Sequence, residues 1–222
     1  MRYAVSSRVL CAILLFLARA AAAQFYAGTM AAVTSLSGDT RSIITPTSTE
    51  FSSYDPQNGL GVNFLGGKQL NDYVSIQGDY VWNRNALTLS AAAINGASAG
   101  KYQETMESSQ QSAFASVLVY FRSRTSRLRP YLSVGTGVVH LSSSVTNVSL
   151  QQGSLIAPRA FDSNFIALRV PVGIDVKMHD GWYFRYSFSE NISRNPISDQ
   201  LSPPATHTFK NFQNLFGVIH QF

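Results

Sequence analysis

Six charged side chains carry the most obvious chemistry, because they recur at alternate positions of segments that are otherwise apolar. They are Asp79, Arg122, Arg169, Asp175, Lys177 and Arg185. Alternate side chains of a strand share one face, so parity places these charges opposite the branched apolar residues. If the segments close into a narrow barrel, the charges lie in its lumen and must be paired or hydrated. They could form a gate whose ion pairs rearrange or a permanent polar plug, which is favoured because eight strands leave no wide channel.

A basic turn and four histidines are the other candidates. Four arginines crowd the segment 122–129, where they could meet phosphates or an anionic polymer, although most such runs are solvated turns. The histidines show no local pairing with serine and no base-orienting acid. The sequence contains no metal-ligand cluster, phosphate-cradling glycine loop or nucleic-acid motif. We therefore expect no enzyme activity, cofactor, metal or nucleic-acid partner.

The first 23 residues are predicted to be a cleaved secretory signal. Arginines precede an apolar run from 9 to 18, and three alanines at 21–23 form a small-residue cleavage pattern. The run is too short for a membrane-spanning helix, which takes roughly 20 apolar residues. The only cysteine, Cys11, falls in this segment, so the domain 24–222 is expected to lack thiol chemistry. Removing its three arginines lowers the formal charge from +5 to about +2, which is too little to indicate nucleic-acid binding.

Residues 24–222 contain repeated segments of about ten residues with period-two patterning, which indicates strands. In 164–177, for example, the even positions from 166 onward carry Ile, Leu and Val while Arg169 and Asp175 are at odd positions. Eight strands are predicted, over 24–36, 57–66, 72–83, 112–123, 130–141, 164–177, 181–191 and 210–222. Four links are long and rich in Ser, Thr, Asn, Gly and Pro, namely 37–56, 84–111, 142–163 and 192–209. Short turns separate them, as in an all-β, antiparallel up-and-down transmembrane barrel with long extracellular loops and short periplasmic turns.

The polar face decides between a membrane barrel and a soluble one. A soluble barrel would load that face with Lys and Glu, whereas this chain places mainly Gly, Ser, Asn and Gln there and is only 13% charged, against roughly 25% in soluble domains. Aromatic residues near strand ends are expected to form interfacial girdles. The predicted girdle consists of Tyr80, Trp82, Tyr120, Tyr131, Trp182 and Phe222.

Several segments make the chain resemble the OmpA-type family of small outer-membrane barrels, porin-like proteins whose transmembrane domain has eight antiparallel strands. They are VSIQGDY at 74–80, PYLSVGTG at 130–137, VGIDV at 172–176, WYFRY at 182–186 and NLFGVIHQF at 214–222. The resemblance implies that the terminal Phe222 is read by the barrel-assembly machinery. The peptidoglycan-binding domain that follows in many members is not expected, because the chain stops at its last strand. Pro171 departs from a regular strand and predicts a bulge or an end of pairing.

These features predict an integral protein of the Gram-negative outer membrane, exported through the signal and with both termini in the periplasm. Its partners would be outer-membrane lipid including lipopolysaccharide, the assembly machinery, and an unknown molecule bound by the loops. Three functions stay open. A non-enzymatic scaffold, cell-envelope or surface-interaction role through the four loops is favoured over a narrow pore gated by the lumen charges, and a lipid-modifying enzyme is third.

Overall fold

Alternation of apolar and polar residues produces a chain made almost entirely of antiparallel strands in the computed structural model, which describes residues 24–36, 40–42, 50–93, 99–157, 159–197 and 208–222. The predicted signal 1–23 and its cleavage site lie outside these ranges. The strands are β1 (Phe25–Leu36), β2 (Thr40–Ser42), β3 (Glu50–Pro56), β4 (Gly59–Gln69), β5 (Val74–Ala93), β6 (Gly100–Tyr120), β7 (Leu128–Gly153), β8 (Ala160–His179), β9 (Trp182–Arg194) and β10 (Thr208–Gln221). None of the described residues forms a helix long and apolar enough to cross a membrane.

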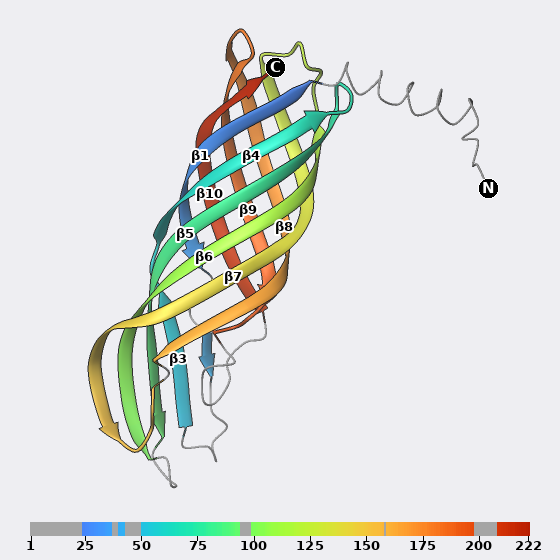
Figure 1. Cartoon of the computed structure of the whole chain (residues 1–222). Coiled ribbons are helices and arrows are strands. Elements are labelled where there is room, and N and C mark those ends of the chain that lie inside the picture. Colours follow the sequence, from blue (N-terminus) through green and yellow to red (C-terminus); the bar gives the residue numbers. More distant parts are fainter. Residues whose placement is uncertain (1–23, 37–39, 43–49, 94–98, 158, 198–207) are drawn as a thin grey trace, which may run out of the picture.

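Eight of these strands close a ring in the order β5-β4-β1-β10-β9-β8-β7-β6, because β5 also pairs with β6 (Figure 1). The first and last strands close it, with Tyr26 opposite Gln221 and Leu36 opposite Asn211. The predicted eight-stranded antiparallel barrel is therefore confirmed. The remaining strands, β2 and β3, form a small hairpin whose β3 pairs with the far part of β5.

The two ends of the barrel differ in how the strands are connected. At one end lie the start of β1, the end of β10 and the short turns 70–73, 121–127 and 180–181, and we call it the terminal end. Its turns are built locally: the Asn71 side-chain oxygen accepts hydrogen bonds from the backbone N–H groups of Tyr73 and Val74, and Gly181 adopts a φ of 76°. The opposite end, with the long projecting hairpins, is the hairpin end (Figure 1).

Two of the four predicted loops are mostly strand. Pairing of β5 with β6 continues to Ala93 opposite Gly100, and β7 runs on to Gly153, so most of 84–111 and 142–153 belongs to the sheet. The prediction was wrong for these two segments because their content of small and polar residues was interpreted as a sign of loops. In these segments Ser, Asn, Gln and Thr replace large apolar residues on the outward face, so the alternation of hydropathy fades although the hydrogen-bond ladder continues.

Pro171 interrupts one ladder without a bulge. The β7–β8 pairing has the same register on both sides, but it omits the two pairs that would involve Ser133 and Val134. On its other side Pro171 stays paired with Ser189. The proline ring replaces the N–H donor that would have faced β7, so the expected disturbance is a local gap in one seam of the barrel.

Candidate functional site: the barrel interior

The lumen near the terminal end is organised around one buried ion pair. Arg185 of β9 lies directly across the ladder from Asp175 of β8. Its Nε donates to Asp175 Oδ1 over 2.6 Å and its Nη2 to Oδ2 over 2.7 Å. Only 1% of either side chain is exposed. A bidentate guanidinium–carboxylate contact of this kind is the strongest geometry available to such a pair.

This pair is tied to the opposite wall. Arg185 Nη1 donates to Gln77 Oε1 of β5 over 2.6 Å, and Nη2 donates to the Tyr120 hydroxyl of β6 over 2.8 Å. The Tyr26 hydroxyl of β1 also donates to Gln77 Oε1, over 3.0 Å. Three strands other than β8 and β9, namely β1, β5 and β6, therefore touch this guanidinium or its ligands. None of the three pairs with β8 or β9, so this network crosses the lumen and fills it.

A second ion pair lies beside the first but is held more loosely. Arg169 Nη1 is 3.6 Å from Asp79 Oδ1, beyond hydrogen-bond distance, and Arg169 Nη1 and Nε have no hydrogen-bond partner. The carboxylate is better satisfied, because Gln77 Nε2 donates to both of its oxygens over 3.0 Å and Asn63 Nδ2 donates over 3.2 Å. Gln77 thus links the two pairs into one cluster.

Two tyrosines predicted for the girdle point inward. Tyr120 and Tyr131 are each only 3% exposed and stand opposite each other on β6 and β7, with ring centroids 5.5 Å apart. Parity explains the error, because Tyr120 shares its face with the lumen-facing Leu118. The Tyr131 ring lies against the wall at Gly173, where a built Cβ would come within 2.5 Å of the hydroxyl. Only glycine admits the ring there.

Two predicted lumen charges are outside it, and one that was assigned to the turn is inside. Arg122 is exposed because the β6 ladder ends at Tyr120, and Lys177 is exposed at the terminal end although it still pairs with Tyr183, just before the β8–β9 register shifts. Arg129 is only 2% exposed, with its guanidinium 3.9 Å above the Tyr120 ring and Nη2 donating to the Asp72 carbonyl. The lumen charges in this half are therefore Asp79, Arg129, Arg169, Asp175 and Arg185.

The space left in this half is very small. Two internal cavities, one beside Arg169 and Arg185 and one beside Arg129 and Asp175, have volumes of about 10 Å³ each. A cavity needs roughly 10–15 Å³ to hold one water molecule. The side chains therefore close the lumen at this level to anything larger than water.

At the hairpin end the same lumen is largely apolar. One cluster of buried side chains fills it, with members from seven strands and from the links after β7 and β9. They are Leu36, Tyr54, Leu87, Leu89, Ala91, Tyr102, Met106, Leu141, Ala157, Phe161, Ile197 and Phe209. Sequence reasoning missed it by treating 84–111 as loop, although Leu87, Leu89 and Ala91 alternate as a buried strand face should. This half resembles the core of a soluble domain rather than a pore lining.

One carboxyl lies in this apolar cluster. Glu104 is 1% exposed and its Oε1 has no hydrogen-bond partner. Burial raises the pKa of the Glu104 carboxyl above its ordinary value. Burial, with the nearby Glu104, also raises the pKa of the Tyr102 phenol to about 12. The neutral forms of both groups are thus favoured in the folded hairpin half.

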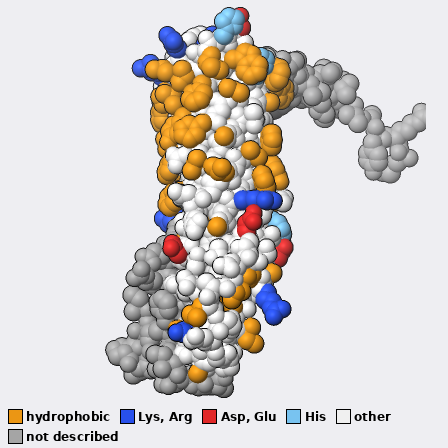
Figure 2. Space-filling view, turned by 90° about the vertical axis from the view of Figure 1, so that its left-hand side faces the viewer, with side chains coloured by type: hydrophobic (Ala, Val, Ile, Leu, Met, Phe, Trp, Pro, Cys, Tyr) orange, Lys and Arg blue, Asp and Glu red, His pale blue; other side chains and the backbone are white. Residues whose placement is uncertain are grey.

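The outer wall carries the apolar belt that the fold predicts. Tyr80 is 42%, Trp182 46% and Phe222 72% exposed, whereas Trp82 is half-buried. Figure 2 shows the apolar side chains gathered over the wall towards the terminal end, above a level where charged side chains appear. Two outward ion pairs lie further along their strands from the terminal end, Arg84 with Glu107 at 3.2 Å and Lys210 with Glu190 at 2.8 Å, and we call their position the charged level. From Ile76 to Trp82, β5 presents apolar residues or glycine outward, which suits a membrane-spanning band.

Among the described residues, the polar and ring contacts of His140 and His220 are with groups other than serine. His140 Nδ1 is 2.9 Å from Asn164 Oδ1 and 3.5 Å from Asp162 Oδ1, on the outer wall. His220 lies between the rings of Trp182 and Phe222, at centroid distances of 4.8 and 4.7 Å. Within the described ranges no group of three or more His, Cys, Asp or Glu could hold a metal ion.

Comparison with known proteins gives a family and a fold. Residues 8–213 match the family described as the outer membrane protein beta-barrel domain. Neisserial surface protein A is 14% identical, with 89% of this chain and 97% of that structure covered and a TM-score of 0.53. OprG of Pseudomonas aeruginosa is 13% identical, with coverages of 90% and 95% and a TM-score of 0.49. No curated protein matches the chain. At these identities the structural likeness concerns the fold alone.

Proposed function

The chain belongs to the outer membrane protein beta-barrel domain family, and we propose that it is a non-enzymatic protein whose filled barrel holds the projecting strands and loops of the hairpin end at the cell surface. The filled lumen is the observation that carries the proposal. The charged cluster closes the terminal half and the apolar cluster fills the hairpin half. The interior therefore stabilises the barrel and leaves no path for a solute.

The proposed orientation places the terminal end in the periplasm and the hairpin end outside the cell. Short turns face the periplasm in barrels of this kind and long connections face outward. The strands continue well beyond the belt, since β5 extends from Arg84 to Ala93 past the charged level. Binding of a partner, with the scaffold or cell-envelope role, is assigned to this projecting part and its loops.

Biogenesis and lipid contacts follow the same orientation. We assign removal of a signal at 1–23 and recognition of Phe222 by the barrel-assembly machinery to export and insertion. The apolar belt would contact outer-membrane lipid, with lipopolysaccharide on the side of the charged level marked by Arg84 and Lys210.

Thiol labelling on intact cells tests the orientation. The described residues contain no cysteine, so Gln151→Cys at the hairpin end and Thr125→Cys at the terminal end introduce single reporters. A membrane-impermeant maleimide should label Gln151→Cys on intact cells and Thr125→Cys only after lysis. The reverse pattern would overturn the orientation and move the surface role to the other end.

A narrow pore is the second candidate, and the loosely held Arg169 favours it, because two of its nitrogens have no hydrogen-bond partner that would be lost on rearrangement. Single-channel recording of the refolded chain in a planar bilayer separates the two functions, beside Arg185→Ala and with a heated and unheated gel as the folding check. The plug predicts no discrete steps from the folded wild type. Steps that change in Arg185→Ala would establish the pore.

The lipid-modifying enzyme is the third candidate. Unchanged lipid A mass on overexpression would argue against it.

A further inference from the structure

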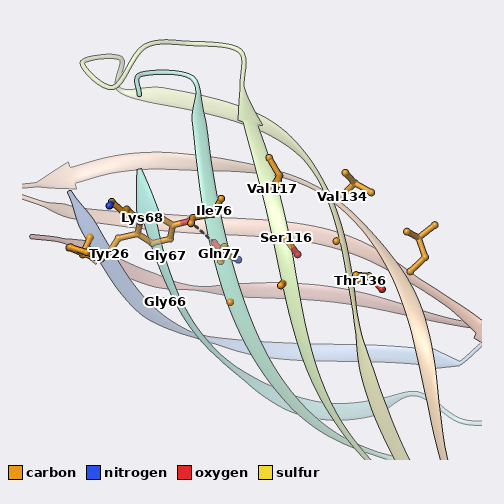
Figure 3. A pocket seen from close by; sticks show the side chains of 15 residues that line it. Tyr26, Gly66, Gly67, Lys68, Ile76, Gln77, Ser116, Val117, Val134 and Thr136 are labelled. Carbon is orange, nitrogen blue, oxygen red and sulfur yellow. Dashed lines mark hydrogen bonds between the residues drawn. The ribbon is translucent and has the colours of Figure 1, made fainter. Parts of the chain in front are cut away.

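A large apolar groove lies on the lipid-facing wall towards the terminal end, where it crosses β4, β5, β6 and β7 (Figure 3). Its volume is about 1040 Å³, at the upper limit of the roughly 300–1,000 Å³ of small-molecule sites. Ile76, Val117, Val134 and Leu168 form apolar walls. Its lining also includes Tyr26 and Gln77, which take part in the lumen network, but its apolar walls face outward, away from that network.

Strand register explains why the wall is hollow there. Gly66, Gly78, Ala115 and Thr136 stand opposite one another on successive strands and face outward. A row of four small residues therefore crosses these strands. A Cβ added at Gly66 or Gly78 would meet nothing nearer than 3.9 Å, so the space above the backbone is open. Backbone geometry does not require glycine at these positions, and bulk could be added without a clash.

Lys68 is the one charged residue among the described residues that line the groove, on the side nearest the terminal end. Lys68 pairs across the ladder with Phe25, and its Nζ lies 5.6 Å from the centroid of that ring. No acid of the described residues forms an ion pair with Lys68. A lysine at the edge of an apolar belt extends its amine towards the headgroup level. The groove thus offers an apolar trough with a single unmatched cation at its end.

We propose that this groove binds one phospholipid of the leaflet at the terminal end, with an acyl chain in the trough and the headgroup phosphate against Lys68. Lipid tails are as apolar as the wall, so burial alone gives no preference for this position. Retention must come from close packing in the trough and from the charge-assisted contact at the phosphate. The proposal requires a membrane-embedded wall and does not depend on the role of the hairpin end.

Native mass spectrometry of the full chain tests it, after extraction from vesicles of phosphatidylglycerol and phosphatidylcholine in equal amounts. The wild type should keep one phospholipid per chain, and phosphatidylglycerol should be preferred several-fold. Gly78→Leu fills the trough and should lower the retained fraction about tenfold. Lys68→Gln should abolish the preference for phosphatidylglycerol. Ala31→Leu on β1 adds the same bulk outside the groove, and Lys177→Gln removes a lysine elsewhere at the terminal end, so both should behave as wild type.

Each alternative result has a clear meaning. A wild type that carries no lipid, or a Gly78→Leu variant that keeps as much as Ala31→Leu, would overturn the proposal, provided that heated and unheated gels show folded barrels. A dimer mass that Gly78→Leu abolishes would also overturn it, by showing that a second copy covers the groove. Equal retention of both lipids by the wild type, with no loss of retention in Lys68→Gln, would overturn the phosphate contact at Lys68 and with it the proposal.

Discussion

The two halves of the lumen are filled by opposite chemistry within one continuous sheet. Near the terminal end the interior is polar and ionic, with Arg185 bonded to three different side chains. Near the hairpin end it is an apolar cluster that includes Leu89 and Met106. The outside explains the difference. Where lipid covers the wall, the apolar residues face out and polar ones fill the lumen, whereas past the charged level water covers the wall and the apolar residues turn inward.

The halves also differ in how much each contact depends on its neighbours. The ionic half has a few strong bonds that share Gln77 and Arg185, so removing one member leaves others buried and unmatched. The apolar half has many weak contacts, so the loss of one side chain leaves a cavity of limited cost. The two halves should therefore respond differently to substitution.

The largest effect is expected from Arg185→Met, which keeps most of the volume but leaves Asp175 buried without its partner. Breaking a buried ion pair costs about 3–5 kcal/mol, so the urea midpoint of the refolded barrel should fall accordingly. The double variant Arg185→Met with Asp175→Leu should recover most of that loss, because no buried charge remains. A double variant as unstable as the single one would show that the network contributes more than the pair.

Leu89→Ala should cost about 2–5 kcal/mol but only within the hairpin half. The cavity loosens the apolar cluster, while the lipid-covered half keeps its own contacts. Hydrogen exchange should therefore speed up in β5 from Arg84 to Ala93 and stay unchanged near Ile76. Equal acceleration in both places would mean that the two halves unfold as one unit.

Arg169→Met tests the looser ion pair. Asp79 would keep its hydrogen bonds from Gln77 and Asn63, and Arg169 has two nitrogens without a hydrogen-bond partner to lose. We expect a loss of about 1–2 kcal/mol, clearly below that of Arg185→Met in the same urea titration. Equal losses would show that distance and hydrogen bonding do not rank the two pairs.

The smallest effect should come from pH at Glu104. Burial raises the pKa of this carboxyl in the folded state, so Glu104 binds its proton more tightly when the hairpin half is folded than when it is locally unfolded. Stability of this half should therefore fall as pH rises from the ordinary carboxyl pKa, about 4.3, to the raised folded-state pKa, and then level off. Hydrogen exchange of residues 102–106, corrected for intrinsic rate, should show this trend in the wild type. Glu104→Gln should abolish it.

The local pattern determined more of the fold than of the site. Period-two alternation identified the eight barrel strands and the inward faces of Asp79, Arg169, Asp175 and Arg185, because neighbouring side chains of a strand must alternate. The pairing of Asp175 with Arg185 is also local, since the short turn at 180–181 sets the register of β8 and β9. Arg122 was misplaced because alternation was carried past the end of β6 at Tyr120, and Lys177 because its ladder position lies at the terminal end, where side chains reach solvent.

Spacing along the chain is enough to predict a closed antiparallel barrel with a polar lumen face and an apolar outer face. Which side chains meet across the lumen depends on the folded barrel. Gln77 contacts Arg185 from 108 residues away, and that contact exists only once β1 and β10 close the ring. The apolar hairpin core has the same origin: its members come from seven strands, and no single segment shows that the inside and outside exchange character at the level of Arg84. Alternation along a strand is a local property, whereas contact across a barrel depends on closure and register.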